Sequence, residues 1–451
     1  MLTMSALAPW WTSVRSAVEE MGVLKRMPMY SMVSGLVVLA GLAREMIVAS
    51  TFGLSGELDV LVAVMGFHLL FGVQVGNAIE SVFVSKTASR HGATIRPLLK
   101  GASLILLAIN VVALTGLVIG SKVLIQWIFP QFSPEQCDTG VRLTRLLLFP
   151  IACAGLAGLM RGGLTVTGSF TPGFLSGAVV SVSTILSVLV FADRWGIDAV
   201  IWGFALGHFL VLIWFVTLLF REPLPYPAAE VGAVDVQAVE LWRPVGIVLI
   251  GEALFQAIAM TERSFASGLG TGTIAAFFYA SSVVAVPLAL FTAPVNTTVF
   301  PRLARAFQAS SRQGRDLLIR YGILLFGITS LLSVMLMLGS EPLIEAALAR
   351  GKFSTTDAQL TANILSVLVW GLPFASLYGM VRNSFYSLSD YRTPLAGYGV
   401  KWVTLGLCGI WLMPSLGVDG LALASVLAQA ADTGVMGWLL QRRLVYRCEG
   451  V

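Results

Sequence analysis

Long apolar runs separated by short polar segments dominate the chain. A membrane-spanning helix needs about 20 mostly apolar residues, and each of these runs is close to that length. The pattern predicts an all-α polytopic membrane protein with about 12 transmembrane helices. The predicted spans cover residues 30–52, 59–84, 101–120, 143–163, 174–192, 198–220, 243–267, 274–301, 318–340, 360–381, 394–414 and 419–441.

Composition excludes a soluble enzyme. The chain of 451 residues is 57% hydrophobic and 12% charged, whereas a soluble domain carries about 25% charged residues. The formal net charge is +5, but the basic residues lie in short segments between apolar runs. They therefore indicate orientation in a membrane, and no nucleic-acid partner is expected.

The basic residues predict that both termini are cytoplasmic. Nineteen lysines and arginines fall on the side of the N-terminus and six on the other side, as the positive-inside rule requires. The predicted organisation has five parts, and residues 1–29 lack the long apolar core of a signal peptide. These parts are a cytoplasmic or interfacial segment (1–29), an N-lobe (30–220), a cytoplasmic linker (221–242), a C-lobe (243–441) and a cytoplasmic tail (442–451).

The two halves repeat each other with the same orientation. A shift of 217 residues places Glu45 on Glu262, and a shift of 221 places Phe132-Ser133 on Phe353-Ser354. This offset corresponds to six spans. Parallel repeats are typical of transporters whose substrate path lies between two lobes, so we expect a central cavity.

No cofactor or metal site is predicted. The histidines share no metal-ligand spacing, the cysteines form no CxxC pattern, and the chain has no Gly-rich nucleotide loop. Nothing here indicates an enzyme. His68 and His208 are expected to be satisfied core residues.

Arg44 and Glu45 are charged neighbours within the first span. Adjacent residues on a helix point about 100° apart, so they are not expected to pair simply with each other. Arg44 either forms an interhelix ion pair or contacts an anionic substrate, for which a guanidinium is suited.

The seventh span carries four candidate substrate-binding residues, Glu252, Gln256, Glu262 and Arg263. Positions 252, 256, 259 and 263 lie on one stripe at helical spacing. The stripe predicts either a polar face toward the cavity, or Arg263 reaching the outer surface while Glu252 meets another helix.

Other polar positions carry weaker predictions. Asp59 lies at the start of the second span. A carboxylate is favourable there because the N-terminus of a helix carries a partial positive charge. Asn77 and Glu80 lie on one side of the second span near its cytoplasmic end, where they either line the inner opening of the cavity or contact water. Arg161 is expected to anchor its span at the cytoplasmic membrane surface. Proline kinks helices, so Pro287 and Pro294 in the eighth span are hinge candidates.

Several segments resemble the MurJ/MviN family of lipid II flippases in the MOP exporter superfamily. The run GLAREMIVASTFGLSGELDVLVAV (41–64) is similar to the family's first two spans, and FYSLSDYRTP (385–394) is its most specific piece. The resemblance implies that an undecaprenyl-pyrophosphate-linked saccharide is flipped from the inner to the outer leaflet. It places a cavity arginine on Arg44, a neighbouring acid on Glu45 and the acid of the second span on Asp59, which are therefore candidate substrate-binding residues.

The sequence also departs from the family. Family arginines fall on Gly72 and Ser282 and near Val38, and Arg263 is a candidate replacement charge. The family usually has fourteen spans, not twelve. The resemblance therefore implies either lipid II or another lipid-linked glycan, such as an exopolysaccharide unit, as substrate.

Three other functions remain open from the sequence. A multidrug or organic-cation antiporter fits twelve spans, but cavity arginines argue against a cationic substrate. A glycan polymerase would need a larger outer loop than 121–142 or 341–359. A non-transporting scaffold for envelope-synthesis proteins leaves the costly intramembrane charges unexplained.

Overall fold

The structure is a computed structural model that describes residues 35–88, 95–221, 234–292 and 309–448 without 389 and 391, together with 299, 302, 303 and 305–307. The predicted segment 1–29, most of the linker and Pro294 lie outside the described residues.

The described part consists of helices joined by short turns and contains no strand, as the apolar pattern predicts. Eleven of its helices are long and apolar enough to cross a membrane. The last of them, α15 (Thr393–Cys448), contains a reversal at Gly417, where φ is 57° and ψ is −126°. Counting its two arms separately gives the predicted twelve spans.

The N-lobe contains the first six spans. They are the helix Gly35–Phe52, then α2 (Gly56–His68), η2 (Leu69–Gln74) and α3 (Val75–Ala88) as one span, α4 (Ile95–Ile128), α5 (Pro134–Val166), α6 (Thr171–Trp195) and α7 (Asp198–Arg221). Helices α4 and α5 extend through most of the segment 121–142 that was predicted as an outer loop, so the non-helical connection is limited to residues 129–133.

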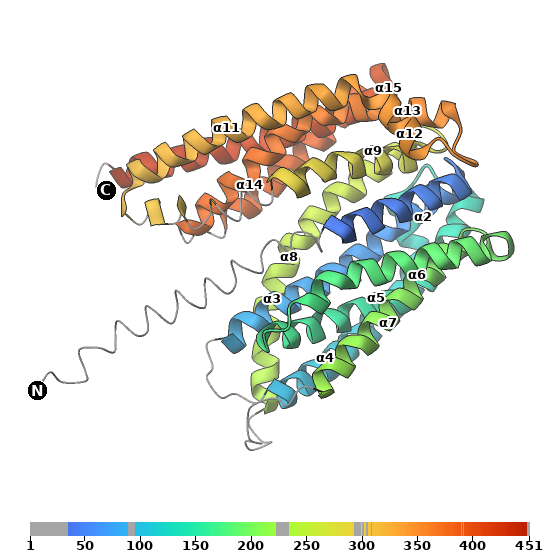
Figure 1. The fold of residues 1–451 in the computed structure, drawn as a ribbon, viewed down its shortest axis with the longest axis horizontal. Coiled ribbons are helices and arrows are strands. Elements are labelled where there is room, and N and C mark those ends of the chain that lie inside the picture. The colour runs from blue at the N-terminus through green and yellow to red at the C-terminus, as the bar shows by residue number, and fades with distance from the viewer. Residues whose placement is uncertain are drawn as a thin grey trace, which may run out of the picture.

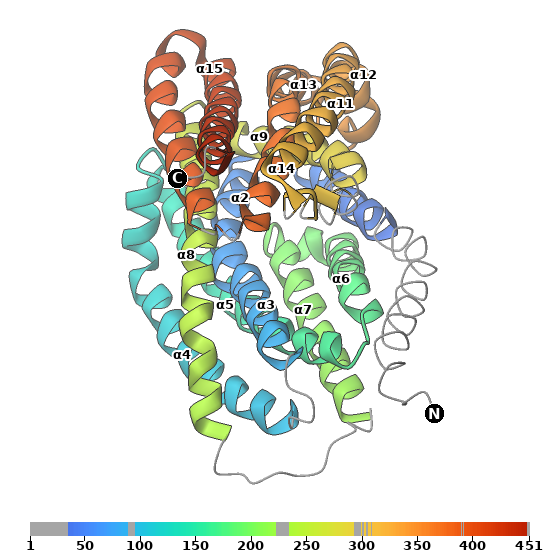
Figure 2. The ribbon, with the colours of Figure 1, turned by 90° about the vertical axis from the view of Figure 1, so that its left-hand side faces the viewer.

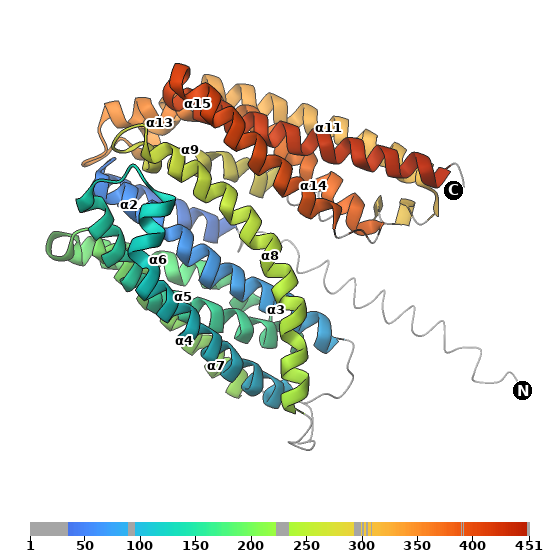
Figure 3. The same ribbon diagram turned by 180° about the vertical axis from the view of Figure 1, so that it is seen from behind.

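The C-lobe contains the remaining spans. They are α8 (Val234–Ser267), α9 (Thr273–Pro287) with η4 (Leu288–Thr292), α11 (Ser311–Leu338), α13 (Thr355–Leu368) with η5 (Val369–Gly371) and α14 (Leu372–Ser387) as one span, and the two arms of α15; the short α12 (Ser340–Leu348) follows α11. Helix α8 (Val234–Ser267) begins inside the segment predicted as a linker and packs against α3 and α4 as well as α15. It therefore crosses from one lobe to the other (Figures 1 and 3).

Local geometry repeats between the halves at the predicted offset. Gly196 ends α6 with φ 54° and ψ −137°, matching the reversal at Gly417. Ser133 and Ser354 each form a capping box at the start of the next helix. A π-helical turn follows both α2 and α9, so each lobe carries the same irregularity at the same depth.

The two lobes meet at one end and diverge toward the other. In Figure 1 they lie closest where α2 approaches α9 and α12, and they separate toward the C-terminal end of α15. The side view in Figure 2 shows the same two-tier arrangement, with α8 running along both tiers. We call the first end the closed end.

Glycines allow helices within the N-lobe to approach closely. A Cβ added to Gly158 on α5 would fall on the backbone of Gly76 on α3. Small residues at such crossings are typical of membrane helix pairs.

Gly158→Ala is therefore expected to destabilise the protein. Overpacking costs about 1–3 kcal/mol, and the obstructing atoms here are backbone atoms that cannot rotate away. Thermal unfolding in detergent measures the effect, with Gly116→Ala on α4 as the control, since nothing lies within 4 Å of its added Cβ. Equal unfolding midpoints for the two variants would contradict the close packing.

Candidate functional site

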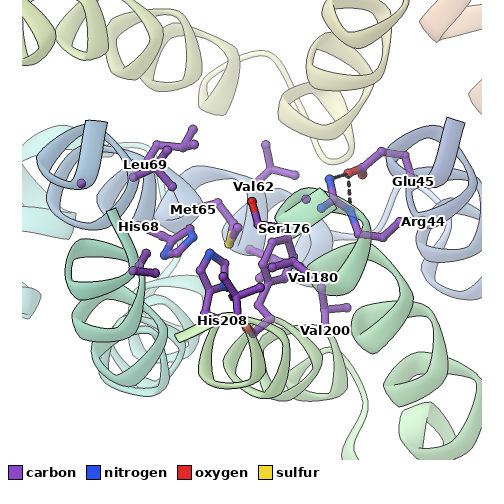
Figure 4. Close-up of a pocket in the computed structure, with 18 of the residues that line it drawn as sticks. Arg44, Glu45, Val62, Met65, His68, Leu69, Ser176, Val180, Val200 and His208 are labelled. Atoms are coloured by element: carbon purple, nitrogen blue, oxygen red, sulfur yellow. Dashed lines mark hydrogen bonds and ion pairs between the residues drawn. The ribbon is translucent and has the colours of Figure 1, made fainter. Parts of the chain in front are cut away.

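A cavity of about 370 Å³ lies against the N-lobe beside α8 and α9. Its wall is mostly apolar, with a limited set of polar side chains. These are Arg44, Glu45, His68, Asn77, Arg161, Ser176, His208, Arg263 and Tyr279. Figure 4 shows Arg44 and Glu45 at one side of the cavity and the two histidines at the other.

Arg44 and Glu45 form an ion pair on the cavity wall. Arg44 Nε donates to Glu45 Oε1 at 3.0 Å, and its guanidinium lies 4.9 Å above the ring of Phe204 on α7. The expectation that these neighbours do not pair is wrong, because both side chains are long enough to turn back toward each other. A guanidinium has five N–H donors, so Arg44 retains donors for a ligand.

Arg263 reaches the cavity from α8. Gly66 on α2 makes room for it, since an added Cβ there would be 2.6 Å from Arg263 Nη1. Nη1 is buried and has no hydrogen-bond partner among the described residues. Of the polar stripe predicted on the seventh span, this side chain is the one that lines the cavity.

The other polar residues of the seventh span lie elsewhere. Glu262 accepts a hydrogen bond from Ser425 of α15 at 2.8 Å, so it faces the C-lobe interior. Gln256 is buried, and neither it nor Glu252 lines the cavity. Their predicted role in substrate binding stays a prediction.

Arg161 joins α5 to α3 at the cavity wall. It donates to Glu80 at 2.6 Å and to Asn77 at 2.7 Å. The sequence predicts only an interfacial anchor at Arg161, so this network was missed. The signal was the spacing of Asn77 and Glu80, which places both on one helix side.

Asp59 lies outside the cavity, at the closed end. Its buried carboxylate accepts hydrogen bonds from the backbone N–H groups of Gly272 and Ala275, at 2.5 and 2.8 Å. These N–H groups open α9, and the first N–H groups of a helix have no partner within it. One carboxylate therefore ties α2 to the start of α9.

Main-chain contacts complete the closed end. Lys352 N donates to Ser50 O at 2.7 Å. Gly53 and Gly351 both have φ of +60°, and a Cβ on Gly53 would be 2.6 Å from Lys352 O. The two loops fit together because both positions are glycine.

Pro287 ends α9 directly before the π-helical turn η4. π-Helical turns are frequent at functional sites, so the predicted hinge at this proline stays a proposal with local support.

The family model described as Lipid II flippase MurJ matches residues 48–450. The chain belongs to the MurJ lipid II flippase family. A probable lipid II flippase MurJ of Bdellovibrio bacteriovorus is 26% identical over 62% of this chain, and the match spans 54% of that protein, less than two thirds of its length.

Solved structures of the same fold include a lipid II flippase MurJ in an inward closed conformation. It has a TM-score of 0.77 at 21% identity, over 92% of this chain and 87% of that one. An inward-facing multidrug resistance MATE transporter of the MOP superfamily matches with a TM-score of 0.68 at 12% identity, over 93% and 99%. Membership of the family and this fold confirm the predicted all-α, two-lobed membrane architecture.

Proposed function

We propose that this protein flips a lipid-linked saccharide with a pyrophosphate head group across the bacterial cytoplasmic membrane by alternating access. The substrate is lipid II or a related undecaprenyl-pyrophosphate glycan, moved from the inner to the outer leaflet. Family membership supports the substrate class. The observation that carries the proposal is the unpartnered buried Nη1 of Arg263 in the same cavity as Arg44.

The cavity suits an anionic head group. Guanidinium forks bind phosphate oxygens bidentately, and Arg44 and Arg263 approach the cavity from different lobes. A head group held by both would contact both halves of the protein. Movement of one lobe relative to the other would then change the access of the bound substrate.

The basic residues give the orientation in this proposal. Both termini lie in the cytoplasm, so the closed end faces outward and the described conformation is open to the inside. The long lipid tail would remain in the bilayer, and envelope-synthesis proteins would supply and consume the saccharide.

An organic-cation antiporter is the second candidate, favoured by the twelve spans and the MATE-like fold. The positive groups on the cavity wall oppose it, because they repel a cationic substrate.

Complementation tests the proposed substrate. A bacterium depleted of its own lipid II flippase and expressing this chain is expected to keep growing if lipid II is moved. Membrane insertion is verified in parallel, and a chain truncated before the C-lobe serves as the control. Lysis with verified insertion would exclude lipid II. Loss of exopolysaccharide on gene deletion in the host would then identify a different lipid-linked glycan.

A further inference from the structure

Two histidines from different N-lobe helices meet at the cavity wall. His68 ends α2 and His208 lies on α7, and their ring centroids are 4.7 Å apart with an interplanar angle of 81°. Both rings also contact Phe204, at 6.0 and 6.2 Å. Figure 4 shows the two rings side by side within the cavity.

Only one histidine of the pair has a hydrogen-bond partner for its Nδ1 atom. His208 has its Nδ1 2.9 Å from the carbonyl oxygen of Phe204. His68 is 2% exposed, and its Nδ1 has no hydrogen-bond partner in the part of the chain that the structure describes. The expectation of satisfied core histidines is therefore wrong for His68. A buried polar atom without a partner indicates a missing ligand or a functional role.

The pair lies where the helix is irregular. His68 directly precedes the π-helical turn η2, which interrupts the regular hydrogen-bond pattern of the second span. A change in charge at His68 therefore occurs directly beside the irregular turn of this span.

The surrounding charges make the pair sensitive to an anion. The titratable groups that line the same cavity come from every side: Arg44 and Glu45 from the first helix, Arg161 from α5, Arg263 from α8 and Tyr279 from α9. Arginines outnumber carboxylates in this set. A buried imidazolium costs free energy unless it is paired, and a bound anion would supply the counter-charge.

We propose that the His68–His208 pair binds one proton together with the anionic head group, so that substrate movement is coupled to proton movement. This inference rests on the proposed function and adds the coupling ligand. The proton passes from water at the open end to an imidazole nitrogen, and it leaves when the head group leaves. Two adjacent imidazolium groups repel each other, so the pair takes one proton.

Histidine NMR tests the coupling directly. The chain has three histidines, so protein labelled with ¹³C-histidine gives three imidazole signals, and His91→Gln removes the one outside the pair. Signals are followed between pH 5 and 8 with and without farnesyl pyrophosphate, a short prenyl pyrophosphate. We expect the ligand to move the protonation midpoint of one signal of the pair upward by about one pH unit, a tenfold change in proton affinity.

Affinity measurements provide the reciprocal readout. By linkage, farnesyl pyrophosphate is expected to bind the wild type about tenfold more tightly at pH 5.5 than at pH 7.5, relative to His68→Gln and His208→Gln. The ratio of wild-type to variant affinity cancels the effect of pH on the pyrophosphate group itself. His91→Gln is expected to behave as the wild type.

The outcomes separate the two proposals. Binding of farnesyl pyrophosphate without any change in the pair's signals overturns proton coupling and leaves the proposed function standing. If His68→Gln and His208→Gln both fold and their affinity for farnesyl pyrophosphate depends on pH as in the wild type, proton coupling is also overturned. Absence of farnesyl pyrophosphate binding to the wild type overturns the proposed coupling of a proton to a pyrophosphate in this cavity, whereas complementation decides the proposed function. The NMR comparison uses the wild type, so it tests the coupling even where a Gln variant fails to fold.

Discussion

Arg44→Ala is expected to lower transport by about ten- to a hundredfold while the protein still inserts in the membrane. A hydrogen bond to a charged group contributes about 1.5–3 kcal/mol, and each 1.36 kcal/mol is a factor of ten. Arg44 lies on the cavity wall with donors to spare beyond its pair with Glu45. Transport of labelled lipid-linked glycan into the outer leaflet, at matched expression, measures the loss.

The effect must be separated from the loss of the ion pair itself. Arg44→Ala leaves Glu45 without its partner, so the double variant Arg44→Gln with Glu45→Gln is measured beside it. Arg142→Ala is the matched control, because Arg142 is more exposed and pairs with Asp198 away from the cavity. Normal transport in the double variant would remove Arg44 from the substrate site.

Asp59→Ala is expected to open the closed end. The substitution leaves the N–H groups of Gly272 and Ala275 without their acceptor. Each unsatisfied buried donor costs about 1–3 kcal/mol, and the favourable charge at the start of α9 is also lost. We expect the population open to the outside to rise at least about tenfold.

Thiol labelling measures this population. A cysteine at Ser176, which lines the cavity, is introduced after replacement of the four native cysteines. An impermeant maleimide added outside intact cells should label it faster in Asp59→Ala than in the parent. Glu57→Ala is the control, since Glu57 is an exposed acid in the same helical turn. Equal labelling rates in all three proteins would show that Asp59 does not hold the closed end.

The sequence predicted the spans well because each depends on a local requirement for about 20 apolar residues. The repeat was also predictable, because residues such as Ser133 and Ser354 occur at equivalent positions in the two halves and cap equivalent helices. The contents of the cavity were harder to predict. Which residue of a polar stripe faces the cavity depends on helix rotation, and helix periodicity alone did not distinguish Arg263 from Gln256.

Contacts between distant helices explain the remaining differences. The meeting of His68 with His208 requires α2 and α7 to face the same cavity, which no local pattern encodes. Asp59 can join α2 to α9 only because the first N–H groups of α9 lie beside its carboxylate, and the sequence does not give that position. Arg44 and Glu45 pair through side-chain rotamers, which the direction of their Cα–Cβ bonds does not determine.

The closed end is held by main-chain atoms, by glycines that fit against carbonyl groups, and by one carboxylate buried against a helix start. Dissolved ions screen exposed charges strongly but buried contacts weakly. Ionic strength should therefore leave the opening equilibrium nearly unchanged, while it weakens the attraction of a pyrophosphate to the arginines. Opening of the closed end and binding of a pyrophosphate in the cavity are therefore expected to differ in their dependence on ionic strength.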